Sequence, residues 1–345
     1  MKRRIRRSLC FLALLCLLLC SACAPFCVTL PSDTADTGEY LSPEELRGDL
    51  VSVGFSQLGS ESLWRRANTE SVEQALREEN GYFLLFHNAR QKQENQIKAI
   101  RSFISQNVDC IVFSPITEEG WTTVLEEARK AEIPVILLDR SIDRRDEALY
   151  TSFVGEDMEQ EGRNAGLWLE SYTRGRGMEE QELRIAVLRG TRGSSAQRGR
   201  SMGFDRILEK HPNWHIVQQA DGDFTTAKAK EAMQDILRSG VPFDVLLSQN
   251  DDMTFGALEA LSEAGIPTGE DGIAVISFDA CKQALKLVEQ GVINVDIECN
   301  PESGELLASV IARIMRGEEV EKAYYMEDRV FTKDNVREVI GNRGY

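Results

Sequence analysis

The chain has 345 residues, of which 42% are hydrophobic and 28% are charged, a composition typical of one or two globular α/β domains and not of a disordered chain. It carries 56 acidic and 40 basic residues, a formal net charge of −16. Such a surface repels nucleic acid and anionic lipid headgroups, so the composition argues against nucleic acid as a partner.

Residues 1–22 have the three parts of a secretory signal. Five basic residues within positions 2–7 precede an apolar run from Leu9 to Cys20, and the small residues Ser21 and Ala22 follow. The run is shorter than the roughly 20 apolar residues that a membrane-spanning helix needs. Removal of this segment would leave 35 basic against 56 acidic residues, a formal charge of −21.

The four residues from Cys20 to Cys23 resemble a bacterial lipoprotein processing box, with Cys20 where leucine is usual. This resemblance implies that Cys23 is lipidated and becomes the first residue, anchored in membrane lipid. A plain cleaved signal is the alternative. Residues 23–47 include a stretch rich in Ser, Thr, Asp and Pro, which indicates a tether.

Five of the eight cysteines lie in the signal or just after it, so Cys110, Cys281 and Cys299 remain for the globular part. An odd number without CxxC spacing argues against a zinc site or a disulfide framework. We therefore expect small buried thiols and no metal, with a Cys281–Cys299 bridge left open as the alternative.

Short apolar runs alternate with amphipathic stretches from Leu50 onward, which is the pattern of a parallel, doubly wound sheet. The first series predicts strands over 50–56, 82–86, 110–113 and 135–138, with helices over 62–80, 91–107 and 119–131. The second predicts strands over 149–154, 183–188, 215–219, 243–247, 273–278 and 293–297, with helices that start near residues 158, 196, 226, 253, 282 and 301. Two series exceed what one sheet usually holds, so we expect two Rossmann-like lobes.

The two series also repeat one pattern. The run Ile133–Asp139 in the first matches Ile273–Asp279 in the second, and each ends a central strand on an aspartate. If the lobes face each other, Asp139 and Asp279 approach one cleft from opposite sides, because ligands bind beyond the carboxyl ends of parallel strands. The alternative is that each aspartate belongs to an ordinary polar turn.

Catalysis finds little support in the sequence. None of the three histidines lies near a candidate nucleophile in a motif, and GxSxG, HExxH and a P-loop ending in GK[ST] are absent from the sequence. Gly190–Ser195 resembles a phosphate-binding loop but lacks the lysine, which favours a tight turn. We expect a binding protein that is not an enzyme and needs no cofactor.

Polar residues gather instead where strands end. Asp139 and Arg140 offer acceptors and donors side by side, as a polyhydroxylated ligand requires. Trp64 can lie against the C–H face of a sugar ring or belong to a helix core, and Phe224 is a second candidate aromatic face. Asp251, after Asn250, is expected to cap the next helix.

Five segments together resemble the type I periplasmic sugar-binding proteins of the ribose-binding-like group, and most closely the galactofuranose-binding proteins of ABC importers. The segments are Val53–Arg65, Gln91–Phe103, Ile133–Ile142, Gly222–Thr225 and Gln249–Met253, and the resemblance covers about residues 50–329. It implies a two-lobed clamp with a three-stranded hinge, crossing near Phe153–Gly155, Asp279–Glu298 and Met326–Arg329. The implied N-terminal lobe is 48–153 plus 300–328, and the implied C-terminal lobe is 154–299 plus 329–345.

The same resemblance implies a monosaccharide ligand and a set of sugar contacts. The contacts are Ser56, Glu61, Trp64, Asp139, Arg140, Arg198, Phe224, Asn250, Asp279 and Glu298. Two departures, Met158 where relatives have asparagine and Cys299 where ribose binders have an amide, argue against ribose itself.

The resulting prediction is a monomeric, lipid-anchored, extracytoplasmic protein that delivers a furanose sugar, galactofuranose-like, to an ABC permease in the membrane. The alternative is a sugar sensor that presents its closed lobes to a receptor kinase or chemoreceptor. The signal segment, in place of a helix-turn-helix head, argues against a repressor.

Overall fold

The computed structural model describes residues 49–345. The predicted signal, the tether over 23–47 and the lipidated Cys23 all lie outside the described residues. Within 49–345, each helix is too short or too polar to cross a membrane.

The N-lobe is built on a six-stranded sheet in the order β11-β5-β4-β3-β1-β2, in which all neighbouring strands are parallel. Its strands are β1 (Val51–Gln57), β2 (Tyr82–Asn88), β3 (Cys110–Phe113), β4 (Val135–Leu138), β5 (Ser152–Gly155) and β11 (Ala323–Tyr325). Its helices are α3 (Leu63–Ala75), α4 (Gln93–Ser105), α5 (Thr122–Lys130) and α11 (Gly304–Met315), with the short 3₁₀ helices η1 (Glu78–Asn80) and η2 (Arg144–Leu149).

The C-lobe is built on a second sheet in the order β12-β10-β9-β8-β6-β7, parallel except for the β10–β12 pair. Its strands are β6 (Leu183–Arg189), β7 (Trp214–Asp221), β8 (Val245–Ser248), β9 (Ala274–Asp279), β10 (Val295–Glu298) and β12 (Val330–Phe331). Its helices are α6 (Met158–Gly175), α7 (Ser195–Leu208), α8 (Thr226–Arg238), α9 (Asp251–Glu263), α10 (Lys282–Glu289) and α12 (Arg337–Ile340), with the 3₁₀ helix η3 (Gly269–Asp271).

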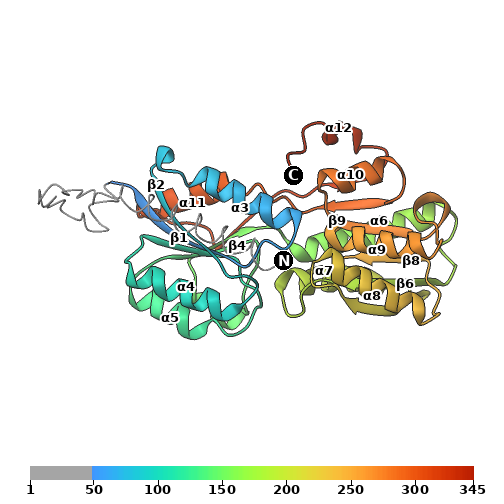
Figure 1. Cartoon of the computed structure of the whole chain (residues 1–345), viewed down its shortest axis with the longest axis horizontal. Helices are drawn as coiled ribbons and strands as arrows, with labels where there is room; N and C mark the ends of the chain where they lie inside the picture. The colour runs from blue at the N-terminus through green and yellow to red at the C-terminus, as the bar shows by residue number, and fades with distance from the viewer. Residues whose placement is uncertain (1–48) are drawn as a thin grey trace, which may run out of the picture. The chain divides into compact units, whose positions relative to one another are not determined.

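Both sheets are covered on both faces, which is why central strands such as β3 and β4 are continuous, fully buried apolar runs. In the N-lobe, Ile111 and Phe113 pack with α4 and α5, whereas Cys110 and Val112 face α3 and α11. Helix α11, from near the end of the chain, thus lies beside α3, from near its beginning (Figure 1). In the C-lobe, α6 and α7 cover one face and α8 and α9 the other.

Three chain crossovers join the lobes, and we call them the hinge: residues 156–157, 299–303 and 326–329. The second begins just after the segment near Asp279–Glu298, in line with the implied lobe boundary at 299/300. Both of those residues end strands of the C-lobe sheet, so the chain leaves this lobe only after β10. The predicted two-lobed α/β fold with parallel sheets is confirmed.

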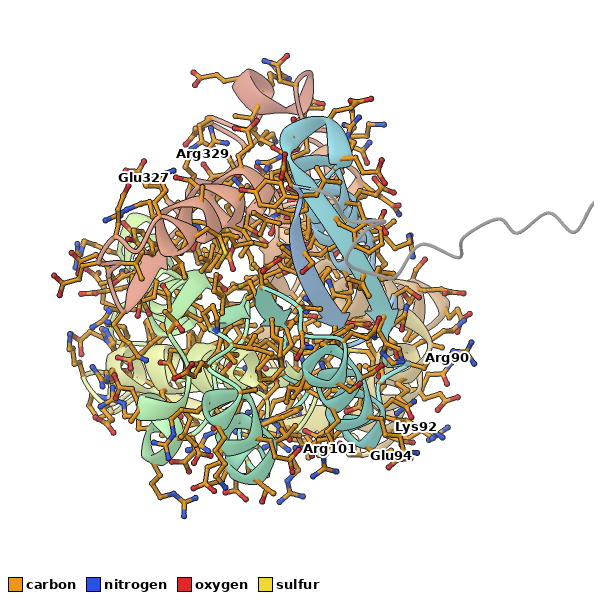
Figure 2. The ribbon with its side chains drawn as sticks, turned by 90° about the vertical axis from the view of Figure 1, so that its left-hand side faces the viewer. Arg90, Lys92, Glu94, Arg101, Glu327 and Arg329 are labelled. Carbon is orange, nitrogen blue, oxygen red and sulfur yellow. The ribbon has the colours of Figure 1, made fainter. Side chains whose placement is uncertain are left out.

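Most predicted elements agree with the structure to within two or three residues, and β3 and β4 coincide with their predicted ranges. The first helix is shorter than predicted: it ends at Ala75, and η1 follows, closed by Gly81 at φ 87°. Charged side chains such as Arg90, Lys92, Glu94 and Arg101 project outward from the N-lobe around α4 (Figure 2). These side chains point into solvent, whereas the candidate site lies between the two lobes.

Candidate functional site

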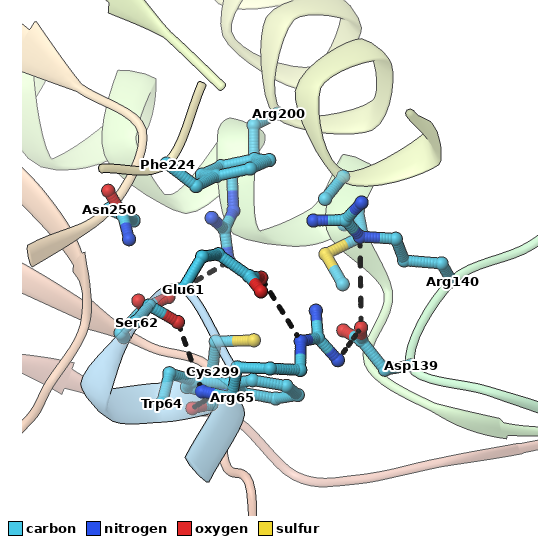
Figure 3. Close-up of a pocket in the computed structure, with 13 residues that line it drawn as sticks. Glu61, Ser62, Trp64, Arg65, Asp139, Arg140, Arg200, Phe224, Asn250 and Cys299 are labelled. Atoms are coloured by element: carbon cyan, nitrogen blue, oxygen red, sulfur yellow. Dashed lines mark hydrogen bonds and ion pairs between the residues drawn. The ribbon is translucent and has the colours of Figure 1, made fainter. Parts of the chain in front are cut away.

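A cavity lies where the carboxyl ends of strands from both sheets meet (Figure 3). Its lining is Glu61, Ser62, Trp64, Arg65, Asp139, Arg140, Met158, Ala196, Arg200, Phe224, Asn250, Asp279 and Cys299. It holds about 310 Å³ of empty space, of which about 20 Å³ can take the centre of a water molecule. The lining side chains, several of them charged, therefore lie so close together that little of this space is wide enough for water.

The two aspartates that end corresponding strands line this same cavity. Asp139 follows β4 and Asp279 ends β9, and both have left-handed backbone angles, φ 63° and 105°. This conformation is unfavourable for a residue with a Cβ, by about 1–3 kcal/mol, and such strain is typical of functional sites. The turn that follows each central strand thus carries a carboxyl group into the cavity, as the repeated pattern predicted.

Arg65 organises the N-lobe side of the cavity. Ser62 caps α3 by accepting from the Arg65 backbone N–H, and the Arg65 guanidinium lies 2.7 Å from Asp139 Oδ2 and 3.4 Å from Glu61 Oε1. Burial alone would lower the pKa of Arg65, but Asp139 and Glu61 outweigh burial and the pKa is raised. Glu61 Oε2, in contrast, is buried without a hydrogen-bond partner anywhere in 49–345.

Arg140 is buried beside this network but is poorly paired. Its contacts are a 3.3 Å hydrogen bond to the Ile116 carbonyl, Asp139 Oδ2 at 3.8 Å and the face of Phe224 at 5.2 Å. Its Nε finds no hydrogen-bond partner within the described chain. Burial and the neighbouring Arg65 guanidinium lower the pKa of Arg140 to about 10. The cavity therefore contains a buried donor and a buried acceptor with unused hydrogen-bonding capacity.

Arg200 organises the C-lobe side. Its guanidinium lies 2.6 Å from Glu161 Oε2 and 3.4 Å from Asp279 Oδ1, and it donates to the Gln249 carbonyl. Burial raises the pKa of Asp279 well above its usual range, although Arg200 opposes the shift. One guanidinium serves two buried acids, and the shorter contact goes to Glu161. Asp279 is therefore inclined to hold a proton and to offer a donor as well as an acceptor.

Two aromatic side chains complete the lining. The Trp64 indole N–H donates to the Cys299 carbonyl at 2.6 Å, which fixes the ring against the hinge, and its face carries the Arg65 guanidinium at 4.6 Å. The Phe224 ring packs so closely over Gly190 that a Cβ there would lie 1.8 Å from the ring. The absence of a side chain at Gly190 thus makes room for the Phe224 ring, in addition to the role of this residue in the predicted βα turn.

Asn250, not Asp251, caps α9. The Asn250 side chain accepts from the Met253 backbone N–H at 3.0 Å, so the prediction of Asp251 as the capping residue is wrong. Asp251 is the first residue of the helix and is buried, accepting from the Ser277 hydroxyl at 2.6 Å and the Cys281 N–H at 2.8 Å. Asn250 lines the cavity while it caps the helix.

Three predicted contact residues do not line the cavity. Ser56 is fully buried within β1. Glu298 accepts from Arg329 at 2.9 Å and from Arg343 at 2.7 Å, which ties β10 to the third crossover and to the end of the chain. Arg198 is largely exposed and pairs with Glu118 of the other lobe at 2.5 Å.

The structure brings in six lining residues that the predicted set lacks: Ser62, Arg65, Met158, Ala196, Arg200 and Cys299. Helical spacing could have identified Arg200. Ala196, Arg200, Phe204 and Ile207 form the buried stripe of α7, and residue 198 lies half a turn away from it. Arg65 has a weaker signal, its place four residues after Glu61 on the same helix face.

The three cysteines of the described chain are free and buried. The interpretation as small buried thiols agrees with this arrangement, and the alternative Cys281–Cys299 bridge is not formed.

Two α/β lobes that are joined by a three-stranded hinge and enclose a polar cavity define a periplasmic-type solute-binding protein, and the chain belongs to this family. Its sequence matches the periplasmic binding protein domain over residues 53–319. The galactofuranose-binding protein YtfQ of Escherichia coli (strain K12) is 41% identical over 254 residues, which are 73% of this chain and 78% of that protein.

Two solved structures are also similar. A Mycobacterium smegmatis protein in complex with β-D-fucofuranose is 39% identical, with a TM-score of 0.80 over 85% of this chain and 94% of that one. The periplasmic binding protein component of the arabinose ABC transporter from Shewanella sp. ANA-3, bound to α- and β-L-arabinofuranose, is 38% identical, with a TM-score of 0.79 over 85% and 95%. The family consists of extracytoplasmic binding proteins without catalytic activity, so the prediction that the chain is not an enzyme is confirmed.

Proposed function

We propose that this protein is the lipid-anchored solute-binding protein of an ABC sugar importer and that it binds one monosaccharide, in its furanose form, in the cavity between the lobes. The sugar contacts in this proposal are Glu61, Trp64, Asp139, Arg140, Phe224, Asn250 and Asp279, joined by Arg65 and Arg200. All nine line the cavity.

The unpaired Arg140 Nε and Glu61 Oε2 carry the proposal. A buried polar atom without a partner is unfavourable by about 1–3 kcal/mol, and more when the group is charged, so these atoms are expected to be satisfied by a ligand. Sugar hydroxyls can both donate and accept, and they suit a cavity that offers a free donor on one residue and a free acceptor on another. Trp64 and Phe224 supply apolar faces for the C–H groups of the ring.

The choice of a furanose rests on three similar proteins, which are described as a galactofuranose-binding protein and as complexes of fucofuranose and arabinofuranose. Fixed guanidinium and carboxyl groups select hydroxyl geometry, because a wrong epimer leaves a buried group unpaired.

Hinge closure is the expected binding motion. Contacts already cross between the lobes: the Leu63 N–H donates to Asp252 at 3.0 Å, the Glu118 N–H to the Gly193 carbonyl at 3.1 Å, and the Ser141 N–H to Ser195 Oγ at 2.9 Å. Only about 20 Å³ of the cavity is open to a water centre. A sugar therefore enters when the lobes separate, and the charged groups fold over it when they close.

A titration of the chain without residues 1–27 tests this proposal, because the described residues, 49–345, belong to one compact unit. Galactofuranose, galactopyranose, arabinose and ribose are compared by tryptophan emission and melting temperature. Trp64 lines the cavity, so we expect a change in emission and a rise in melting temperature with the furanose sugars. If every sugar leaves both signals unchanged, the proposal fails.

Anchoring and transport need separate tests. The proposed anchor is Cys23, followed by the tether over 23–47 that lets the monomer reach its permease. Cys23→Ala should move the protein from the membrane fraction to the soluble fraction and abolish labelling with a fatty acid. Deletion of the gene should abolish uptake of the bound sugar, whereas a sensor would leave uptake intact.

A further inference from the structure

Three potential metal ligands meet where the hinge touches the N-lobe. They are Asp139 after β4, Glu156 in the first crossover and Cys299 in the second, and one ligand atom of each lies within 4.8 Å of the other two. All three residues are at least 96% buried. They lie far apart in the sequence, so no motif spacing connects them.

Glu156 lacks a hydrogen-bond partner. Neither of its carboxylate oxygens finds one among residues 49–345, although the residue is only 2% exposed. Burial raises the pKa of Glu156 well above its usual range, and the nearby acids Asp139, Asp328 and Glu161 raise it further. A buried carboxyl group that faces other acids needs either a proton or a cation from solution.

Asp139 can bind a cation while it keeps its contacts with Arg65 and Arg140. Its contacts with Arg65 at 2.7 Å, Arg140 at 3.8 Å and Ser114 at 3.0 Å all fall on Oδ2. Oδ1 therefore remains available to a second cation, because the two oxygens of a carboxylate can serve different partners.

Cys299 supplies a soft ligand. It is a free cysteine in the crossover that ends β10, and its carbonyl is held by the Trp64 indole N–H. A thiol together with two carboxylates excludes Ca²⁺ and Mg²⁺, which prefer oxygen ligands alone, and favours Zn²⁺, which accepts sulfur and oxygen ligands together.

We propose that Asp139, Glu156 and Cys299 bind a zinc-like divalent cation at the hinge, with water as the fourth ligand. Three atoms that lie within 4.8 Å of one another share a point no more than about 2.8 Å from each, against zinc–ligand distances of about 2.0–2.3 Å. Small side-chain rotations would close this gap. The cation would join two of the three crossovers to β4.

Two of the three proposed ligands also border a second, larger groove. Glu156 and Asp139 line this groove, which lies between the lobes and has a volume of about 870 Å³. Glu156 does not line the sugar cavity, whereas Asp139 lines both. Because Asp139 belongs to both sites, cation and sugar binding are expected to be coupled, and each would change the affinity of the other by the same factor. The zinc site itself does not depend on the identity of the sugar.

Calorimetry and cobalt substitution test the proposal on the full-length protein in a mild detergent, after removal of metal with a chelator. We expect one Zn²⁺ per chain and no binding of Mg²⁺ or Ca²⁺. Co²⁺ should give a thiolate-to-cobalt charge-transfer band, because a cysteine is among the ligands. Cys299→Ser should abolish that band, and Glu156→Gln should weaken Zn²⁺ binding at least tenfold.

Cys110→Ser and Cys281→Ser are the matched controls, since both remove a buried thiol away from the hinge cluster. Both should keep the cobalt band, and the melting temperature of each metal-free variant shows that it is folded. The absence of stoichiometric Zn²⁺, or a cobalt band that survives Cys299→Ser, overturns the proposal. A protein that binds no Zn²⁺ but gains stability at neutral pH from Glu156→Gln would show that the cluster holds a proton only. Zinc binding is read from calorimetry and the cobalt band without sugar, and sugar binding from the titration of metal-free protein, so a failure of either proposal can be told from a failure of the other.

Discussion

The two lobes contribute the same backbone turn to the cavity but different sets of charged side chains. In each lobe an aspartate in a left-handed turn follows a central strand, and an arginine from a neighbouring helix pairs with it: Arg65 with Asp139, and Arg200 with Asp279. The residue after the aspartate differs. It is Arg140 in the N-lobe and Ala280 in the C-lobe.

Because of this difference, the N-lobe offers mainly hydrogen-bond donors to a ligand and the C-lobe mainly acidic groups. In the N-lobe, two guanidinium groups face Asp139, and one of them, Arg140, is left with unused donors. In the C-lobe, one guanidinium serves both Glu161 and Asp279, so that side is rich in acids. A repeated fold pattern therefore predicts where the side chains lie but not how their charges balance.

Removing the paired arginine of each lobe should give the largest difference in stability between the two halves of the site. Arg200→Met leaves Glu161 buried without its 2.6 Å partner, and we expect a loss of about 3–5 kcal/mol in the free energy of unfolding. Arg65→Met should be less damaging, because Arg140 still lies 3.8 Å from Asp139. Urea denaturation without sugar measures both, and equal losses would contradict the proposed difference between the lobes.

The acid-rich C-lobe should also show a distinct pH dependence. Asp251 and Asp296 are buried neighbours in the C-lobe, and Asp296 Oδ2 finds no hydrogen-bond partner within the described chain. Burial raises the pKa of Asp251 to about 6, and burial together with Asp251 and Asp279 raises that of Asp296 further. The folded state then binds more protons than the unfolded state above pH ~4, so stability should fall as the pH rises through about 6.

Asp296→Asn tests this dependence, since a neutral amide beside Asp251 needs no proton from solution. The variant should flatten the pH profile and gain about 2 kcal/mol relative to the native chain near pH 7. Denaturant midpoints from pH 4 to 8 provide the measurement. A native profile that rises over this range would contradict the raised pKa values of these two aspartates.

Arg140→Ala converts the N-lobe turn to the C-lobe pattern. We expect sugar binding to weaken at least tenfold, which corresponds to about 1.4 kcal/mol. Stability without sugar should stay within a few degrees in melting temperature, because Asp139 keeps Arg65 at 2.7 Å and Arg140 itself makes one long hydrogen bond and only distant contacts with Asp139 and Phe224. A large loss of stability with unchanged affinity would assign the residue to the fold and not to the ligand.

Arg198→Ala should have the smallest effect. Arg198 bridges to Glu118 of the other lobe at 2.5 Å but is largely exposed, and exposed ion pairs contribute about 0–1 kcal/mol. Sugar affinity is expected to change by less than about fivefold. A loss as large as that of Arg140→Ala would restore the original prediction that Arg198 contacts the sugar.

Much of the cavity lining was predictable from the sequence. Asp139, Asp279, Trp64, Phe224 and Asn250 all line the cavity, because strand ends and helix starts can be read from local patterns and parallel strands place their carboxyl ends together. Glu61 and Arg140 also line it. Two predicted contacts have other partners in the structure: Arg198 pairs with Glu118, and Glu298 pairs with Arg329 and Arg343.

By itself, the sequence determined the two series of strands and helices, the parallel sheets and the aspartates at the ends of the central strands, because these depend on periodicity over a few residues. Only the tertiary structure decided which distant side chains meet. Arg200 reaches Asp279 across 79 positions, and Trp64 reaches the Cys299 carbonyl across 235. The hinge cluster of Asp139, Glu156 and Cys299 is of the same kind: the lobes must pack and the crossovers must converge before its ligand atoms lie within 4.8 Å of one another.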